Sequence, residues 1–449
     1  MTVDSMHLTG RKKFSRKRGY VVKRAGSIVL AICFICMPLT ACFDAREIDQ
    51  WAYVYTIGVD KGVANVLRFT FQIPSLKQGG GGEGGGGGGG MGGQTEQQKA
   101  YTTISVDAPT FFAGVNMAES CFSRTMNYMH AKFIVISEDL AREGVERFIN
   151  GMVRSRQIRR IMNVIIVRGK ASEYIEGLNP VLTGAISKAL EGFMDTSEDN
   201  GLFLDTNYHN FMKDMKTTYR MPVAPLSALN DFSNYRESGS PPEDFKSEGD
   251  YYAGELPRKG GNKIEFVGTA LFDGDKMVGE LNGDETRAMS MIRGELVNAS
   301  IAIADPLHKG FRITIDTRLQ GKPDIKVAIR KGKPVINVKI LLEGDIENLQ
   351  SPTEYESIKL KPVLENAFKA YIKSNLDKTI YKCKKLNVDV FGFGEKAVRN
   401  FWTIQEWEEY NWLGKFKDSE VNTQVEFTLR RIGTLLKTNP TRNSRGEKK

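Results

Sequence analysis

The N-terminal segment places the strongest limit on how this chain can fold. Eight lysine and arginine residues lie between Arg11 and Arg24, and 15 mostly apolar residues, Ala25 to Leu39, follow them. A helix needs about 20 apolar residues to cross a bilayer, so this run is too short for a membrane span. Basic, apolar and small residues in this order form a secretory signal peptide. The rest of the chain should therefore fold on the outer side of the cytoplasmic membrane.

The residues Leu39-Thr40-Ala41-Cys42 resemble the bacterial lipobox. In that motif the cysteine sulfur receives a diacylglyceryl group, the leader is cut just before the cysteine, and the new N-terminus is acylated. Each buried methylene contributes roughly 0.8 kcal/mol, and stable anchoring takes about two chains. We therefore expect a signal peptide over residues 1–41 and a lipidated Cys42, with the protein held on the membrane by its lipid. The alternative, an uncleaved signal anchor, is less favoured because the chain turns polar at Asp44.

The positive charge of the chain lies mostly in this leader. The full sequence carries a net charge of +9, but residues 1–41 contain eight basic residues and one acid, which leaves +2 for the mature chain. A basic patch or stripe is the mark of a nucleic-acid-binding domain. The mature composition therefore argues against nucleic acid as a partner.

The sequence offers no constellation for catalysis or metal binding. Beyond Cys42, Cys121 and Cys383 remain, and they either form one disulfide or stay as two separate buried thiols, the favoured case because a large fold needs no covalent staple. The three histidines outside the leader stand singly: His130, His209 and His308. None has the spacing of a metal-binding pair, and Gly-x-Ser-x-Gly is absent. We predict neither an enzyme, nor a metal site, nor a cofactor.

The strand and helix patterns indicate an α+β fold of about three mixed domains. The first domain, residues 42–194, should begin with a hairpin over 52–73, in which apolar and polar residues alternate. A run of 13 glycines within residues 79–93 follows, which we interpret as a disordered surface loop because no Lys-Ser/Thr continues it as in a phosphate-binding loop. Further helices are expected at 109–128, 138–150 and 180–194.

The remainder of the chain should form two further parts and a tail. Residues 195–262 are polar and broken by prolines, and they form either a small middle domain or an elaborated connection. The C-terminal domain, residues 263–437, should open with a hairpin over 264–281 and contain an antiparallel-type sheet. A long amphipathic helix over about 352–386 should lie across that sheet. Residues 438–449 are expected to be a polar, frayed tail.

Two clusters of side chains each allow two interpretations. The first consists of four arginines: Arg154, Arg156, Arg159 and Arg160. They could meet an acidic partner or lipid head groups, but such a cluster more often forms a solvated or ion-paired face. The second holds three of the four tryptophans: Trp402, Trp407 and Trp412. It either closes the C-terminal domain as a hydrophobic cluster or anchors a partner, since tryptophan is enriched at interface hot spots.

Five short motifs in order resemble the Ger(x)C family of spore germination lipoproteins. They are Cys42–Ile48 with Ile57–Asp60, Met129–Lys132 with Ile134–Ile136, Phe266–Phe272 with Asp275–Gly279, Asp389–Glu395 with Trp402 and Trp407, and Leu429–Gly433. No single motif is specific, but their order behind a lipobox is, and the resemblance covers most of residues 42–436. The sequence departs from the family at Phe43, where tryptophan is frequent, and in the glycine run.

This resemblance implies a subunit of a nutrient germinant receptor, the C subunit, anchored by lipid on the outer face of the spore inner membrane. It implies two integral-membrane partners, the A and B subunits of the same receptor. Nutrient sensing would then trigger release of ions and dipicolinic acid. The family has no catalytic residues to carry over, and only Cys42 transfers, as the lipidation site. We expect a scaffold role.

Two other classes of protein fit less well. A lipid-anchored solute-binding protein of a transporter is usually doubly wound, and the repeated strand–helix alternation that it needs is missing from the expected elements. A secreted hydrolase would need a nucleophile or metal motif. The receptor subunit is therefore the preferred hypothesis.

Overall fold

The computed structural model describes residues 50–74, 101–178, 186–240 and 245–431, together with the short pieces 26–28, 47 and 444–445. The chain divides into two units, residues 1–51 and 52–449, and the fold described below belongs to the second. Nearly all of the signal peptide, Cys42, the glycine run 79–93 and most of the tail lie outside the described residues. The expectations for those segments stay predictions.

The first lobe is built on a mixed sheet whose described strands follow the order β10-β9-β8-β7-β6-β2-β3-β4. Its strands are β2 (Thr56–Lys61), β3 (Leu67–Pro74), β4 (Tyr101–Ala108), β6 (Phe133–Ser137), β7 (Asn163–Val167), β8 (Val223–Leu229), β9 (Ile264–Asp273) and β10 (Lys276–Leu281). The central strands β2, β6, β7 and β8 run parallel, and both edges are antiparallel. Parallel strands are covered on both faces, which explains the unbroken apolar runs of β6 and β7.

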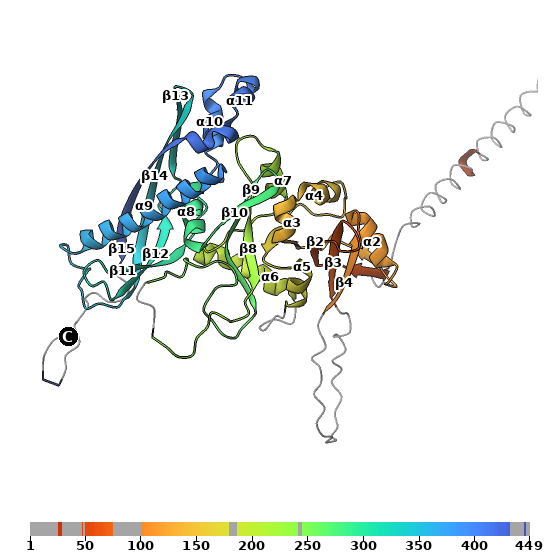
Figure 1. Ribbon diagram of the computed structural model, residues 1–449, viewed down its shortest axis with the longest axis horizontal. Coiled ribbons are helices and arrows are strands. Elements are labelled where there is room, and N and C mark those ends of the chain that lie inside the picture. The colour runs from red at the N-terminus through yellow and green to blue at the C-terminus, as the bar shows by residue number, and fades with distance from the viewer. Residues whose placement is uncertain are drawn as a thin grey trace, which may run out of the picture. The chain divides into compact units, whose positions relative to one another are not determined.

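Helices cover both faces of this sheet, as the yellow and orange part of Figure 1 shows. One face packs against α2 (Phe111–Glu119), α3 (Glu138–Glu143), α4 (Glu146–Met152) and α7 (Tyr208–Lys216). The other packs against α5 (Ala171–Glu176) and α6 (Ile186–Asn200). Successive residues of β6 therefore enter different cores: Ile134 and Ile136 face the first set of helices, and Phe133 and Val135 face the second. A small separate sheet pairs β1 (Trp51–Tyr53) with β5 (Thr125–Asn127).

The second lobe is built on the sheet β11 (Ala299–Ala304), β12 (Arg312–Leu319), β13 (Asp324–Arg330), β14 (Lys333–Leu349) and β15 (Glu420–Arg431). The long strand β14 organises it. β12 and β13 pair with the two ends of β14, antiparallel in both cases, and β15 runs parallel along the other edge of β14. Buried residues of β14 alternate with residues that are more exposed to solvent. One face of the sheet is therefore buried, and the other faces solvent.

Helix α9 (Lys361–Leu386) lies across the buried face of this sheet, next to α8 (Gly283–Arg293), as Figure 1 shows. Its buried side chains recur every four residues: Leu364, Phe368, Ile372, Leu376 and Ile380. The short helices α10 (Phe393–Ala397), α11 (Ile404–Tyr410) and α12 (Trp412–Lys415) follow it. The core of this lobe includes Val223, Leu271 and Leu281 from the first sheet, so the two lobes share one continuous core.

The α+β class and the C-terminal sheet with its long amphipathic helix are confirmed. The hairpin over 264–281 is present as β9 and β10, and its two strands complete the first sheet. Every residue from Ile264 to Phe272 is buried, so β9 needs a neighbour on each edge, and β8 supplies the second one. Segment 195–262, expected as a middle domain or connection, contributes α7 and β8 to the first lobe. The sequence predicts no repeated alternation of strands and helices. The structure contains such an alternation, because helices connect β6 to β7 and β7 to β8.

Four expected helices have different bounds, and the one expected at 180–194 is α6, which extends to Asn200. The helix over 109–128 ends at Glu119, and β5 follows it. The helix over 138–150 is interrupted at Gly144, whose φ of +129° is not helical. The long helix begins at Lys361 and not near residue 352. Strand β11 was not expected. Among the described residues, no helix combines the length and the apolar character that crossing a membrane requires.

Candidate functional site

Cys42, the expected lipidation site, lies outside the described residues. Its modification therefore stays a prediction. The described residues offer four other places where a function could reside: a buried joint between the lobes, a polar cleft, an enclosed carboxylate and the exposed side chains.

A buried arginine joins the two lobes. The side chain of Arg287, on α8, is only 3% exposed. Its Nε donates to the carbonyl of Asn200 at the end of α6 (2.9 Å), and its Nη2 donates to the carbonyl of Ser300 in β11 (3.0 Å). Its Nη1 pairs with Glu248 (2.5 Å) and with Asp284 (3.3 Å). One guanidinium group therefore ties together a helix of the first lobe, the connection before β9 and an edge strand of the second lobe.

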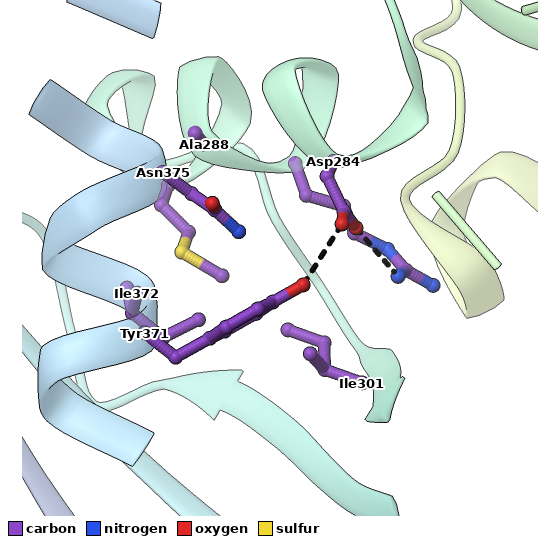
Figure 2. Close-up of a pocket in the computed structure, with 8 residues that line it drawn as sticks. Asp284, Ala288, Ile301, Tyr371, Ile372 and Asn375 are labelled. Atoms are coloured by element: carbon purple, nitrogen blue, oxygen red, sulfur yellow. Dashed lines mark hydrogen bonds and ion pairs between the residues drawn. The ribbon is translucent and has the colours of Figure 1, made fainter. Parts of the chain in front are cut away.

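Asp284 extends this joint to the long helix. Its Oδ2 accepts hydrogen bonds from Tyr371 Oη (2.9 Å) and from Ser247 Oγ. Figure 2 shows Tyr371 reaching from α9 toward Asp284 on α8. Burial raises the pKa of the Tyr371 phenol, and the charge of Asp284 raises it further, so the hydroxyl stays protonated and donates.

The cavity beside this pair is too small for a substrate. It has a volume of about 10 Å³ and is lined by Asp284, Arg287, Ala288, Met291, Ile301, Tyr371, Ile372 and Asn375 (Figure 2). A cavity needs roughly 10–15 Å³ to hold a single water molecule. The residues around it therefore form a structural joint.

A wider cleft, of about 520 Å³, lies where β7 and β8 end and α5 begins. The carboxyl ends of parallel strands are a frequent place for ligands in open α/β sheets. Arg168 lines the cleft and pairs with Glu280 (2.8 Å) and Glu255 (3.3 Å), and Lys170 pairs with Glu173 (2.8 Å). These charges compensate one another within the described residues, so the arrangement assigns no ligand.

The motif Phe391–Gly394 encloses the fully buried carboxylate of Asp389. That carboxylate accepts hydrogen bonds from the four backbone N–H groups of the motif, at 2.8–3.2 Å, and from Trp412 Nε1 at 2.9 Å. Gly392 has a φ of +79°, and a Cβ on Gly394 would lie 2.2 Å from a backbone oxygen, so both positions require glycine. The motif is therefore a tight turn built around Asp389.

This carboxyl group should make stability depend on pH. Burial raises the pKa of Asp389 to about 6, although the hydrogen bonds it accepts act in the opposite direction. An aspartate in an unfolded chain has a pKa of about 4. Because the folded protein holds the proton more tightly, the contribution of Asp389 is complete below about pH 4 and is lost as the pH rises through about 6. We expect the difference in unfolding free energy between the wild type and Asp389→Asn to fall over this window, measured by urea unfolding. An NMR titration that gives the carboxyl its ordinary pKa would contradict this.

The three tryptophans of the cluster do not share one environment, although the sequence groups them together as either a core cluster or a partner-binding anchor. Trp407 and Trp412 are buried and stack with ring centroids 6.0 Å apart, and Trp407 Nε1 donates to Thr218 Oγ1 at 2.8 Å. Trp402 is 96% exposed. Two of the three rings therefore close the core of the second lobe, and the third points to solvent.

The remaining candidate residues are not brought together. The described residues contain no group of three or more His, Cys, Asp or Glu placed to hold a metal ion. The three histidines are exposed and separate: His130, His209 and His308. Cys121 and Cys383 are both free thiols, so the disulfide alternative is wrong. Cys121 is exposed and not buried as expected, whereas burial raises the pKa of the Cys383 thiol.

Two family models match the chain, one after the other. Residues 44–229 match the model described as Spore germination protein N-terminal domain, and residues 267–433 match the model described as Spore germination B3/GerAC like, C-terminal. The pair defines a class of two-part spore germination proteins. The chain belongs to the GerAC, or Ger(x)C, family, which confirms the resemblance found in the sequence.

Individual relatives align over nearly the whole chain. The putative spore germination protein YfkR of Bacillus subtilis (strain 168) is 24% identical over 404 residues, which cover 90% of this chain and 96% of the relative. Spore germination protein KC of the same organism is 22% identical over 426 residues, covering 92% and 96%. The crystal structure of the GerBC protein covers 83% of this chain and 96% of its own, with 15% identity and a TM-score of 0.49.

Proposed function

We propose that this protein is the lipoprotein subunit of a spore nutrient germinant receptor and acts there as a scaffold. The observation that carries the proposal is the ordered match of both family models, together with relatives named as spore germination proteins that align over at least 90% of the chain. The protein is neither an enzyme nor a cofactor carrier in this proposal.

The architecture supports a scaffold role. Two buried charged residues link the lobes: the hydrogen bonds of Arg287 and Asp284 connect α6, α8, α9 and β11. Its small cavity beside Tyr371 has no room for a nutrient molecule, and the wider cleft at the ends of β7 and β8 is lined by charges that pair with one another. A body that is fastened in this way can hold partners at fixed relative positions.

The proposed anchor is a diacylglyceryl and acyl modification of Cys42 on the outer face of the spore inner membrane. The proposed partners are the integral-membrane A and B subunits of the same receptor. Two buried lipid chains are enough for stable attachment of a protein whose described residues include no helix that could span a membrane.

Deletion of the gene tests the proposal. We expect purified spores of the deletion strain, and spores carrying Cys42→Ala, to lose or slow nutrient-triggered germination, measured as dipicolinic acid release. Both should still respond to direct dipicolinate-type triggers, which bypass the receptor. Cys121→Ala is the matched control, because it removes a different cysteine, one that is an exposed free thiol. Spores that carry Cys121→Ala should germinate like the wild type.

Normal germination of the deletion strain with every nutrient tested would contradict the receptor role. Normal germination of Cys42→Ala alone would contradict the role of the anchor and leave the receptor role standing. Mass spectrometry of the native protein reports independently whether residue 42 carries lipid.

A further inference from the structure

The loop between α4 and β7, residues 153–162, carries four arginines and no acidic residue. All four side chains are exposed: Arg154, Arg156, Arg159 and Arg160. Two more exposed cations lie on the flanking helices, Arg147 on α4 and Lys213 on α7. We call these six residues the basic patch.

Hydrogen bonds connect α7 both to the arginine loop and to α4, so the three elements that carry the basic patch lie side by side. The N–H of His209, in α7, donates to the carbonyl of Arg160 (2.9 Å), and Tyr208 Oη donates to the carbonyl of Ile149 in α4 (2.6 Å). Ile158 and Met162 fix the loop from beneath, since both are buried in the core of the first lobe. The arginines are therefore presented by a loop with a defined position.

The six cations have no ion-pair partner among the described residues. The nearest acids in these helices are already paired: Glu146 with Lys216, and Asp214 with Arg220 (2.9 Å). Elsewhere in the first lobe, arginines pair with carboxylates, as Arg68 does with Asp107 (2.6 Å). Like charges gathered without compensation raise the local positive potential and attract an anionic surface.

The chemistry of the patch fits phospholipid head groups. Arginine presents a planar fork of donors that matches a phosphate group, and it is less strongly hydrated than lysine. The apolar side chain of Ile161, directly after Arg159 and Arg160 in the loop, is 61% exposed. A protruding apolar side chain among cations is suited to the boundary between head groups and acyl chains.

The number of residues between Cys42 and the first lobe limits the distance between the proposed anchor and the start of that lobe. Nine residues lie between Cys42 and Ala52, and a fully extended chain spans at most about 3.5 Å per residue step, or about 35 Å over the ten steps. Val54 donates to the carbonyl of Asn127 in β5 (2.9 Å), Met126 in β5 donates to Glu119 at the end of α2 (2.7 Å), and α2 packs against α4. The basic patch is therefore connected through α4, α2 and β5 to Val54, near the start of the first lobe.

We propose that the basic patch binds the anionic phospholipid head groups of the membrane that carries the protein. This inference rests on the proposed lipid anchor at Cys42. The anchor holds the protein on the bilayer, and the patch fixes which side of the first lobe faces it, so the second lobe is held in one orientation toward the membrane partners.

The test uses the mature protein, which starts at Cys42 and carries its lipid, reconstituted into phosphatidylcholine vesicles with and without phosphatidylglycerol. An environment-sensitive fluorescent amino acid replaces Ile161. We expect a blue shift of its emission on the vesicles that contain phosphatidylglycerol, no shift on phosphatidylcholine alone, and loss of the shift at high salt. The double variant Arg156→Glu, Arg159→Glu should lose the shift. The matched control Arg330→Glu, Lys331→Glu, at the exposed turn before β14, should keep it.

Equal emission on both vesicles, or a shift that survives the charge reversal, would overturn the proposal. A shift produced by an acidic polypeptide and not by the anionic vesicles would assign the patch to a protein partner instead. Far-UV circular dichroism verifies that the variants are folded. Mass spectrometry of the same sample shows whether Cys42 carries lipid, so failure of the anchor is distinguished from failure of the patch.

Discussion

Replacing Arg287 with alanine should lower the free energy of unfolding by about 3–5 kcal/mol, the cost of breaking a buried ion pair by removing one partner. The substitution leaves Asp284 buried without its cation and removes the donors to the carbonyls of Asn200 and Ser300. Equilibrium urea unfolding of the full-length chain, followed by circular dichroism, measures the loss. Because these bonds join the two lobes, we expect the unfolding transition to become broader as well as earlier.

Arg142→Ala is the matched control for this prediction. Arg142 also pairs with a carboxylate, that of Glu138 at 2.6 Å one helical turn away, but its side chain is 46% exposed. Exposed pairs of this kind contribute about 0.5 kcal/mol. Arg287→Lys keeps the charge and loses the planar fork, so its effect should lie between the two. Similar losses for Arg287→Ala and Arg142→Ala would contradict the role of the joint.

Elements with strong local signals could be predicted from the sequence. The helix over 283–293 carries such signals at both ends: Asn282 caps it with a reciprocal bond to Glu285, and Gly294 ends it in the left-handed conformation. The alternating strands of the first hairpin and the four-residue repeat of α9 were identified for the same reason. Each of these signals lies within a few residues of the element it defines.

Elements whose limits depend on distant residues could not be predicted. The helix over 138–150 breaks because Val145 N–H donates to Asp275 in the β9–β10 turn (2.9 Å), and a Cβ at Gly144 would lie 2.6 Å from the Asp275 carboxylate. The long helix starts late because Tyr355 Oη bonds Asp305 (2.6 Å), which holds the preceding residues in turns. Neither partner is visible from the local pattern.

The same limit applies to the candidate sites. The partners of Arg287 lie up to 87 residues away, and α8 has an ordinary amphipathic sequence, so nothing marked this residue in advance. The polar cleft joins the ends of two strands about sixty residues apart and gave no local signal either. The arginine loop was recognised because its residues are close together, but only the structure shows that its charges are unpaired.

The tryptophan cluster yields the second large effect. Trp412→Ala should lower the free energy of unfolding by about 3–5 kcal/mol, the range for removing a large aromatic side chain from a core. The ring is 1% exposed, stacks on Trp407, and donates through Nε1 to the buried carboxylate of Asp389. The variant loses this packing and one of the hydrogen bonds that the carboxylate accepts. Urea unfolding gives the magnitude, and an increase in the apparent pKa of Asp389 should accompany it.

Trp402→Ala is the control that shows whether the loss of stability comes from removing a buried ring or from removing any tryptophan in this segment. The two residues lie ten positions apart in the same segment, and the Trp402 ring is 96% exposed. Substitutions on the surface usually change stability by no more than about 0.5 kcal/mol. We therefore expect Trp402→Ala to unfold like the wild type, and Trp412→Phe, which keeps the ring but not the donor, to lie between the two alanine variants. A large loss for Trp402→Ala would mean that its ring is covered in the folded protein, and a small loss for Trp412→Ala would contradict the closure of the second lobe around Asp389.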